Sequence, residues 1–395
     1  MIEFPLSIAH ILNPVALDTF ISRYYEREQL VIDRGRPSHY DGLIAVDALD
    51  DMICAPASTS EDILVVDDFR DIDREDYARA DGTIDCVRVQ QLFDEGATII
   101  LRRMHDRLAS VARLCRGAEQ KFGCAFQANL YFSPPNAQGL TTHHDTHDVF
   151  VLQILGSKRW HTYQPVVPLP LPGQRYYWKT PPEGQQISSF TLHPGDLFYC
   201  PRGIPHNARA TEGASLHISL GARVCTWAEL LLEVVADVAL RDPAFRASLP
   251  LGYAANAIAP EVLEKAMQDL MGRLQRQARP DLVLGLMADR LIIDRPVLIP
   301  EQGRMIQAAA SLTTDSRVGG RPGLMYRISV QRKKVTLICN ARQITFPRFA
   351  ASSLEFALRT DSYLPTDLPG PLTETAKVVL IRRLMREGLV VALPG

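Results

Sequence analysis

Two histidines and an aspartate carry the clearest chemical signal in the chain. His143 and Asp145 are separated by one residue, and His206 ends a later segment of β-like sequence. On a strand, side chains two residues apart point to the same face, so His143 and Asp145 can bind one metal ion while His144 turns away. With His206 they would form a set of two histidines and one carboxylate, which leaves coordination positions open in non-haem Fe(II) oxygenases.

The sequence around these residues predicts the elements that must position them. A mostly apolar run predicts a buried strand, a turn signal follows it, and a second run predicts the returning strand. A tight-turn signature and another apolar strand follow in the sequence. A short segment with prolines and a glycine then connects this strand to His206. In chain order these segments are 148–155, 156–157, 159–163, 193–196, 197–200 and 201–206. The layout predicts a small antiparallel barrel or jelly roll that holds a metal ion in its mouth.

These segments, with those just before them, resemble the JmjC-type ribosomal oxygenases. The resemblance is carried by Asn129 to Asp145, by Asp148 to Trp160, and by the later segments 194–196 and 199–206. It covers about Asn129 to Gly221 and implies an α+β protein with a double-stranded β-helix core of the jelly-roll or cupin type. It also implies Fe(II), 2-oxoglutarate and O₂ as partners in hydroxylation, usually of a protein side chain.

Carried over residue by residue, the resemblance makes His143, Asp145 and His206 the iron ligands. Lys158 falls where the family has the basic residue that pairs with the distal carboxylate of 2-oxoglutarate. A charge-assisted contact of this kind contributes about 1.5–3 kcal/mol. The pattern alone leaves another interpretation open, because Lys158 followed by Arg159 is also typical of an exposed hairpin.

Three further positions match residues that line the site in the family. Asn129 and Ser219 match positions that help hold the co-substrate, and Tyr131 matches one on the substrate side. Each has an ordinary structural alternative: a turn-capping asparagine, a strand serine and a half-buried strand tyrosine.

Two more histidines compete for a place in the site. His147 would share a face with His143 on a regular strand, and we expect it at the rim rather than on the metal. His217 lies in a predicted strand with Ser215 and Ser219 on its face, so it is either a hydrogen-bonded core histidine or, as we expect, a group beside the metal ligands. Thr141-Thr142 replaces the prolines that family members often have before the first ligand, and the segment 173–179 has no clear counterpart. That segment would form either a substrate wall or a surface loop.

Size and composition indicate an ordinary soluble enzyme. The chain has 395 residues, a length that predicts two or three domains. Its residues are 46% hydrophobic and 22% charged, as is typical of a soluble globular protein. It contains no apolar run long enough for a membrane span, and its first residues lack a secretory signal pattern. Seven cysteines without a Cys-x-x-Cys pair predict unpaired thiols in a reducing compartment. We therefore expect a cytoplasmic protein.

Three domains are predicted along the chain: a catalytic domain with its N-terminal flank (1–225), a helical region (226–283) and a C-terminal domain (284–395). The flank has a helical pattern over Pro14–Tyr25 and a strand over Gln29–Asp33, and residues 101–122 predict one helix. In the helical region, apolar pairs such as Leu230-Leu231 and Val234-Val235 predict more than one packing face. Related oxygenases dimerise through this region, so we expect a homodimer rather than an intramolecular bundle.

The C-terminal domain is predicted to be winged-helix-like, as in the ribosomal oxygenases. Its pattern predicts strands at 335–339, 344–346 and 389–393, and helices at 352–358 and 374–387, with Gly388 as a helix stop. Residues 281–395 contain 16 Lys and Arg against 10 Asp and Glu, in a chain whose net charge is −2. This modest excess and the short Arg332-Lys333-Lys334 cluster, which lacks interleaved aromatic residues, do not predict sequence-specific nucleic-acid binding.

The sequence is therefore interpreted as an Fe(II)- and 2-oxoglutarate-dependent hydroxylase of a protein side chain, with arginine or histidine of a ribosomal protein as the expected target. Within the enzyme class, the alternative substrate is a free amino acid, a peptide or a natural-product intermediate. Outside it, the alternative is a metal-free regulatory module that binds DNA through the winged helix.

Overall fold

A computed structural model describes residues 7–55, 58–174, 184–255 and 258–394, in two compact units. The first unit comprises Met1–Val224 with Pro322–Leu324, and the second comprises Cys225–Arg321 with Met325–Gly395. In the described residues, no helix is both long and apolar enough to cross a membrane.

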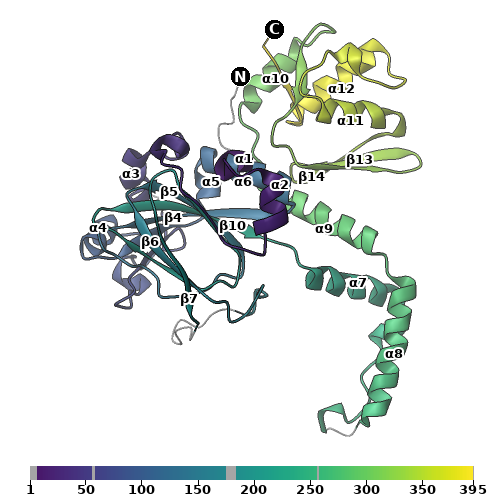
Figure 1. The fold of residues 1–395 in the computed structure, drawn as a ribbon. Coiled ribbons are helices and arrows are strands. Elements are labelled where there is room, and N and C mark those ends of the chain that lie inside the picture. The colour runs from purple at the N-terminus through teal and green to yellow at the C-terminus, as the bar shows by residue number, and fades with distance from the viewer. Residues whose placement is uncertain (1–6, 56–57, 175–183, 256–257, 395) are drawn as a thin grey trace. The chain divides into compact units, whose positions relative to one another are not determined.

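Among its described residues, the first unit contains ten strands, all paired in antiparallel fashion. Figure 1 labels β4, β5, β6, β7 and β10 among them. Their bounds are β1 Leu30–Ile32, β2 Ile63–Val66, β3 Thr98–Leu101, β4 Ala125–Ser133, β5 Asp148–Leu155, β6 Lys158–Tyr163, β7 Gln186–Leu192, β8 Leu197–Cys200, β9 His206–Ala210 and β10 Ser215–Arg223. Seven form one sheet in the order β1-β8-β5-β10-β4-β3-β2, and three form a second in the order β7-β6-β9. Two antiparallel sheets of this kind are the jelly-roll architecture that the sequence predicts.

Strand β10 shows how the larger sheet separates a core from a site. It pairs along its whole length with β4, and it also pairs with β5. Because side chains alternate along a strand, Leu216, Ile218 and Leu220 are fully buried in the main hydrophobic core, whereas His217 and Ser219 point to the opposite face. That opposite face lies toward a second, smaller core that includes Val151, Trp160 and Phe198 of β5, β6 and β8.

Helices of the first unit supply the other side of the main core. They are α1 Ile8–Leu12, α2 Leu17–Thr19, α3 Leu49–Ile53, α4 Cys86–Asp94, α5 Met104–Arg107 and α6 Ala109–Phe122, with short π and 3₁₀ turns η1 Phe20–Tyr24, η2 Pro37–Tyr40, η3 Val46–Ala48 and η4 Arg74–Asp76. The amphipathic α6 buries Val111, Leu114 and Ala118 against the sheet.

The single helix predicted over 101–122 is wrong. Leu101 ends β3, Arg103 adopts a left-handed conformation with φ of 53°, and Leu108 is extended between α5 and α6. Neither conformation continues an α-helix, so two helices form where periodicity alone suggested one.

The prediction of seven unpaired thiols is also wrong. Cys54 follows α3 and Cys86 begins α4, and the structure joins them in a disulfide with their Cα atoms 5.2 Å apart. This Cα distance is within the usual range for a disulfide. The sequence separation of 32 positions between the two cysteines hides the pairing from a search for short spacings.

The second unit joins helices to two small antiparallel sheets. Its elements are α7 Trp227–Arg241, η5 Pro243–Arg246, η6 Tyr253–Ala255, α8 Pro260–Gln277, α9 Pro280–Asp294, α10 Gln302–Ala310, β11 Val318–Gly320, β12 Tyr326–Val330, β13 Lys334–Cys339, β14 Arg342–Pro347, η7 Arg348–Ala350, α11 Ala351–Arg359, η8 Pro365–Asp367, α12 Glu374–Arg386 and β15 Val390–Ala392. Strands β12, β13 and β14 form one sheet, and β11 pairs with β15. These elements confirm the strands and helices predicted between 335 and 393, with Gly388 just beyond α12.

Candidate metal centre

The first two candidate ligands do not lie on a regular strand, contrary to the prediction. Strand β5 begins only at Asp148, and His143 forms a single isolated β-bridge with His206. Two backbone hydrogen bonds make this bridge: His143 N–H donates to His206 O at 3.1 Å, and His206 N–H donates to His143 O at 2.8 Å. This single bridge, rather than a pairing of two long strands, brings the segment of His143 and Asp145 next to His206. His206 itself begins β9, as predicted for a ligand at a strand end.

His143, Asp145 and His206 converge on one point. One ligand atom from each lies within 4.8 Å of the others, and Nε2 of His206 is 3.7 Å from Oδ2 of Asp145. Nδ1 of His143 lies 2.8 Å from Thr141 O, and Nδ1 of His206 lies 3.0 Å from Ile204 O. A carbonyl oxygen can only accept, so Nδ1 carries the proton in both rings and each Nε2 keeps its lone pair for a metal ion.

The electrostatics of the cluster match what metal binding requires. Burial, reinforced by the nearby His143, lowers the pKa of His206 to about 4. Burial opposes the charge of Asp145, but the surrounding histidines, His143 first, hold the pKa of that carboxyl below its usual value. At neutral pH the cluster thus offers a neutral imidazole and an ionised carboxylate, the protonation states in which these groups bind metals.

A buried polar network ties together the loops that carry the ligands. Gly203 N–H donates to Asp145 O at 3.0 Å, which joins the loop before His206 directly to a ligand residue. Asp148, which is completely buried, accepts hydrogen bonds from the backbone N–H of Arg202 at 2.9 Å and from the Tyr199 hydroxyl at 3.0 Å. The Arg202 guanidinium pairs with both Asp148 and Glu26. The ligand positions are therefore fixed by contacts that do not involve the ligand side chains.

A pocket of about 570 Å³, including its open mouth, extends from this cluster between the two sheets. Lys158 lines it and is only 3% exposed, which excludes the alternative of an exposed hairpin charge. Its Nζ donates to Ser133 Oγ at 2.9 Å, and Thr98 Oγ1 donates to the same oxygen. Burial lowers the pKa of Lys158 to about 7, and no carboxylate among the described residues forms an ion pair with it. The pocket thus has three groups that could bind a metal ion and a buried amine that lacks an anionic partner in the described part of the chain.

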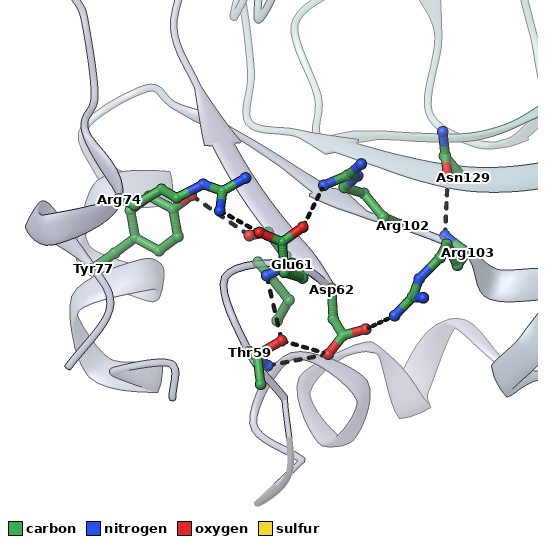
Figure 2. A network of polar contacts seen from close by, with 9 residues as sticks. Thr59, Glu61, Asp62, Arg74, Tyr77, Arg102, Arg103 and Asn129 are labelled. Atoms are coloured by element: carbon green, nitrogen blue, oxygen red, sulfur yellow. Dashed lines mark hydrogen bonds and ion pairs between the residues drawn. The ribbon is translucent and has the colours of Figure 1, made fainter. Parts of the chain in front are cut away.

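The predicted co-substrate and substrate residues are placed differently from one another. Tyr131 and Ser219 line the pocket, whereas Asn129 is not part of its lining although it is paired with Ser219 across the strands. Figure 2 shows Asn129 at the edge of a surface network, where its Oδ1 accepts the backbone N–H of Arg103 at 3.0 Å. The Arg103 side chain pairs in turn with Asp62, whose carboxylate is also bound by Thr59. Asn129 therefore connects β4 to the left-handed turn before α5.

The remaining histidines have separate environments. His217 is buried and lines the pocket, with its ring stacked on Tyr131 at 4.7 Å between centroids. His147 is not part of the three-residue cluster; its ring lies over Gly221, where an added Cβ would approach its Cδ2 to 2.6 Å. His144 points away as predicted, and its Nε2 lies 3.0 Å from Gln174 O. Of the segment 173–179, whose role sequence left open, residues 175–179 lie outside the described residues.

Sequence reasoning missed several residues of the pocket. Thr98 and Ser133 hold the lysine, and Trp160 and Asn207 also line the cavity. Trp160 lies two residues after Lys158 on β6 and so faces the same way, a periodicity signal that was available in the sequence. Thr98 carries no such signal, because only the pairing of β3 with β4 brings it to the site.

Comparison with known proteins identifies similar domains and relatives. The JmjC domain family matches residues 104–230, which include all three clustered ligands. Ribosomal oxygenase 2 of Bos taurus is 30% identical over 251 residues, covering 60% of this chain and 53% of that protein. The bifunctional lysine-specific demethylase and histidyl-hydroxylase NO66 of Aedes aegypti is 31% identical over 228 residues, covering 56% of this chain and 36% of that protein. Over residues 104–230 the chain is therefore similar to JmjC domains, and its curated relatives include ribosomal oxygenases. The chain spans about half the length of the first of these relatives and about a third of the length of the second.

Solved structures extend the likeness to most of the chain. YcfD of Escherichia coli superposes with a TM-score of 0.57 at 19% identity, covering 96% of this chain and 98% of that one. A YcfD ribosomal oxygenase structure in complex with cobalt and 2-oxoglutarate gives a TM-score of 0.55 at 18% identity. At these identities the comparison establishes a shared fold.

Proposed function

We propose that this JmjC protein is an Fe(II)- and 2-oxoglutarate-dependent oxygenase that hydroxylates a protein side chain. The observation that carries the proposal is one pocket that contains both a metal-binding triad and the buried, unneutralised Lys158. A metal triad alone would suit many enzymes. The added cation selects a co-substrate that binds metal through one end and presents a carboxylate at the other, as 2-oxoglutarate does.

The residues present fit such a metal ion. The cluster supplies two imidazole nitrogens and one carboxylate oxygen, the ligand set typical of non-haem Fe(II) oxygenases. When bound, iron would supply the activation of O₂ that is coupled to oxidation of 2-oxoglutarate. Lys158 would hold the distal carboxylate of the co-substrate, and Ser133 and Thr98 would orient the ammonium group. The aromatic walls made by Trp160 and Phe198 would exclude water from the pocket.

For the substrate we favour histidine over arginine, both on a ribosomal protein. Among the described residues that line the pocket, Asp145 is the only carboxylate, and it is assigned to the metal. An arginine guanidinium has donors only and pairs best with carboxylates. A neutral imidazole has one donor and one acceptor, which suits the hydroxyl groups of Tyr131 and Ser219 and the amide of Asn207. Histidyl-hydroxylase is also part of the name of one relative.

The test compares intact masses of ribosomal proteins from cells with and without the chain. We expect one protein to gain one oxygen atom, and fragmentation to place it on a histidine. Cells that express the Asp145→Ala variant are the matched control and should resemble cells without the chain. Turnover of a free amino acid or a natural product with unchanged ribosomal proteins would support the small-molecule alternative. Absence of both metal uptake and succinate formation would support the regulatory module.

We further propose that α7, α8 and α9 mediate a homodimer. On α7, Val234 and Val238 are buried, whereas Leu231 and Leu232 are 59% and 70% exposed. Along α8, all of whose residues are described, none is buried although the helix is amphipathic. Exposed apolar surface on neighbouring helices favours association with a second copy. We take the C-terminal elements of the second unit to be winged-helix-like and not a sequence-specific DNA-binding domain.

Light scattering tests the dimer. We expect a mass near twice the 44.0 kDa of the chain, and a shift toward the monomer when Leu231 and Val235 are both replaced by aspartate. Replacing the exposed Val330 by aspartate, on the sheet of the same unit, is the control and should leave the mass unchanged. A wild-type monomer would contradict the proposal.

A further inference from the structure

Strand pairing gathers four cations at one end of the sheet β12-β13-β14. Arg332 and Lys333 lie in the turn between β12 and β13, Lys334 begins β13, and all three are exposed. Arg348 follows β14, yet its backbone N–H donates to Lys333 O at 3.3 Å. We call these four residues the basic turn. The sequence shows only three of them together, and the antiparallel register adds the fourth.

The basic turn differs from most exposed arginines of its unit, which are neutralised nearby. Arg304, Arg342, Arg359 and Arg383 each form an ion pair with a glutamate. In the part of the chain that the structure describes, none of the four cations of the basic turn has such a pair. Four positive charges with no ion pair to a described residue therefore lie together at one end of this sheet, in a chain whose net charge is −2. A concentrated local charge of this kind attracts polyanions.

Hydrogen bonds close the basic turn, and an exposed aromatic residue follows it directly in the chain. The guanidinium of Arg348 donates to Gln331 O at 3.0 Å, and Gln331 N–H donates to Lys334 O at 2.8 Å, so side-chain and backbone bonds close the turn. Phe349, the next residue after Arg348, is 55% exposed. This placement supplies the aromatic residue that Arg332-Lys333-Lys334 lacks in sequence. Cations beside an exposed ring are the combination with which proteins bind single-stranded nucleic acids, through phosphates and stacked bases.

We propose that the basic turn and Phe349 bind single-stranded RNA without sequence preference. The four cations would contact phosphates, and the Phe349 ring would stack on an unpaired base. An acidic peptide would use the cations but not the ring, and a duplex would keep its bases inaccessible to it. The choice of RNA among single-stranded nucleic acids rests on the proposed function, which places the enzyme at a ribosomal protein.

Salt dependence of binding tests the proposal quantitatively. Four phosphate contacts on a single strand predict a slope of log affinity against log salt of about −2.8, or about a 50-fold loss of affinity between 50 and 200 mM salt. The full-length variant with Arg332→Gln, Lys333→Gln and Lys334→Gln keeps one contact, so its slope should fall to about −0.7 and its loss to about threefold. Phe349→Ala should weaken binding by about 5- to 150-fold with little change in slope. The probe is a fluorescein-labelled 20-nucleotide RNA of mixed sequence, followed by anisotropy.

A matched control removes the same number of charges elsewhere in the second unit. The variant Lys265→Gln, Arg276→Gln and Arg386→Gln should keep the wild-type slope and affinity. Thermal unfolding checks that each variant is folded, and Lys333→Gln alone, expected to reduce the slope by about 0.7, replaces the triple variant if that one is not.

Three outcomes would overturn the proposal: equal slopes for the two triple variants, equal binding of the RNA duplex, or equal competition by polyglutamate of the same charge. The RNA-binding assay needs neither metal nor 2-oxoglutarate. If the protein binds RNA as expected but shows no hydroxylase activity, the result contradicts the proposed function and leaves the RNA-binding proposal standing.

Discussion

Replacement of Lys158 by methionine tests the central feature of the proposed site. Methionine has a similar length and fills the same space without a charge. We expect the affinity for 2-oxoglutarate to fall by about 10- to 150-fold, because one charge-assisted contact of about 1.5–3 kcal/mol is lost. Metal affinity should not change, since Lys158 contacts Ser133 and is not among the clustered ligands.

The same substitution should stabilise the protein when the co-substrate is absent. Burial lowers the pKa of Lys158 from 10.5 to about 7, which corresponds to about 5 kcal/mol of destabilisation of the folded state at pH values below 7. Between pH 7 and 10.5 the unfolded chain binds more protons at this site than the folded chain does, so wild-type stability rises with pH over this window. Lys158→Met removes both the destabilisation and this part of the pH dependence. Thermal unfolding at several pH values measures both.

Co-substrate binding should depend on pH in the opposite direction. Only the protonated amine attracts the carboxylate, so the apparent dissociation constant of the wild type should rise by about fivefold from pH 7 to 8. It should rise further above pH 8 until it reaches the loss of about 10- to 150-fold expected for Lys158→Met. Anaerobic calorimetric titration of the Mn(II)-loaded protein measures it, with 2-oxobutyrate, which lacks the distal carboxylate, as the control ligand. The reasoning is refuted if Lys158→Met binds 2-oxoglutarate as tightly as the wild type, or if it loses affinity for 2-oxobutyrate to the same extent.

Three further predictions concern the metal centre and its support. The clustered candidate ligands are His143, Asp145 and His206. Alanine at any one of them should abolish 2-oxoglutarate turnover coupled to hydroxylation. His147→Ala, in contrast, should still bind metal in a Co(II) absorption titration. Asp148→Asn should raise the dissociation constant for Co(II) by about 10- to 100-fold, because it removes the ion pair with the Arg202 guanidinium and so loosens the loop before His206. Tyr199→Phe, which removes a bond from the same carboxylate but leaves its bond to Arg202, should lower the melting temperature without changing that constant. Gly203→Ala should destabilise the fold by more than about 1 kcal/mol in denaturant unfolding, because φ is +89° there and the added Cβ would lie 2.5 Å from Val167 O; unchanged unfolding would contradict the described loop conformation.

Much of the strand order could be predicted because local patterns control it. The runs 148–155 and 197–200 are apolar and end at turn signals, and the structure has strands at those bounds. The failures occur where the backbone leaves regular geometry. Helical periodicity continues across Arg103 and Leu108, whose conformations end one element and begin another. The His143-x-Asp145 spacing suggested a strand, whereas a single bridge to His206 holds the pair.

The amino-acid sequence by itself determined the ligand types, their order and the jelly-roll pattern, because ligand chemistry is a property of the side chain and alternation is a property of neighbouring residues. Tertiary structure alone decided which side chains meet. It buried Lys158 and supplied Ser133 and Thr98 to hold it, and it placed Asn129 against Arg103 rather than in the pocket lining. These contacts join strands distant in sequence, and their register is set by the whole sheet and not by any local pattern.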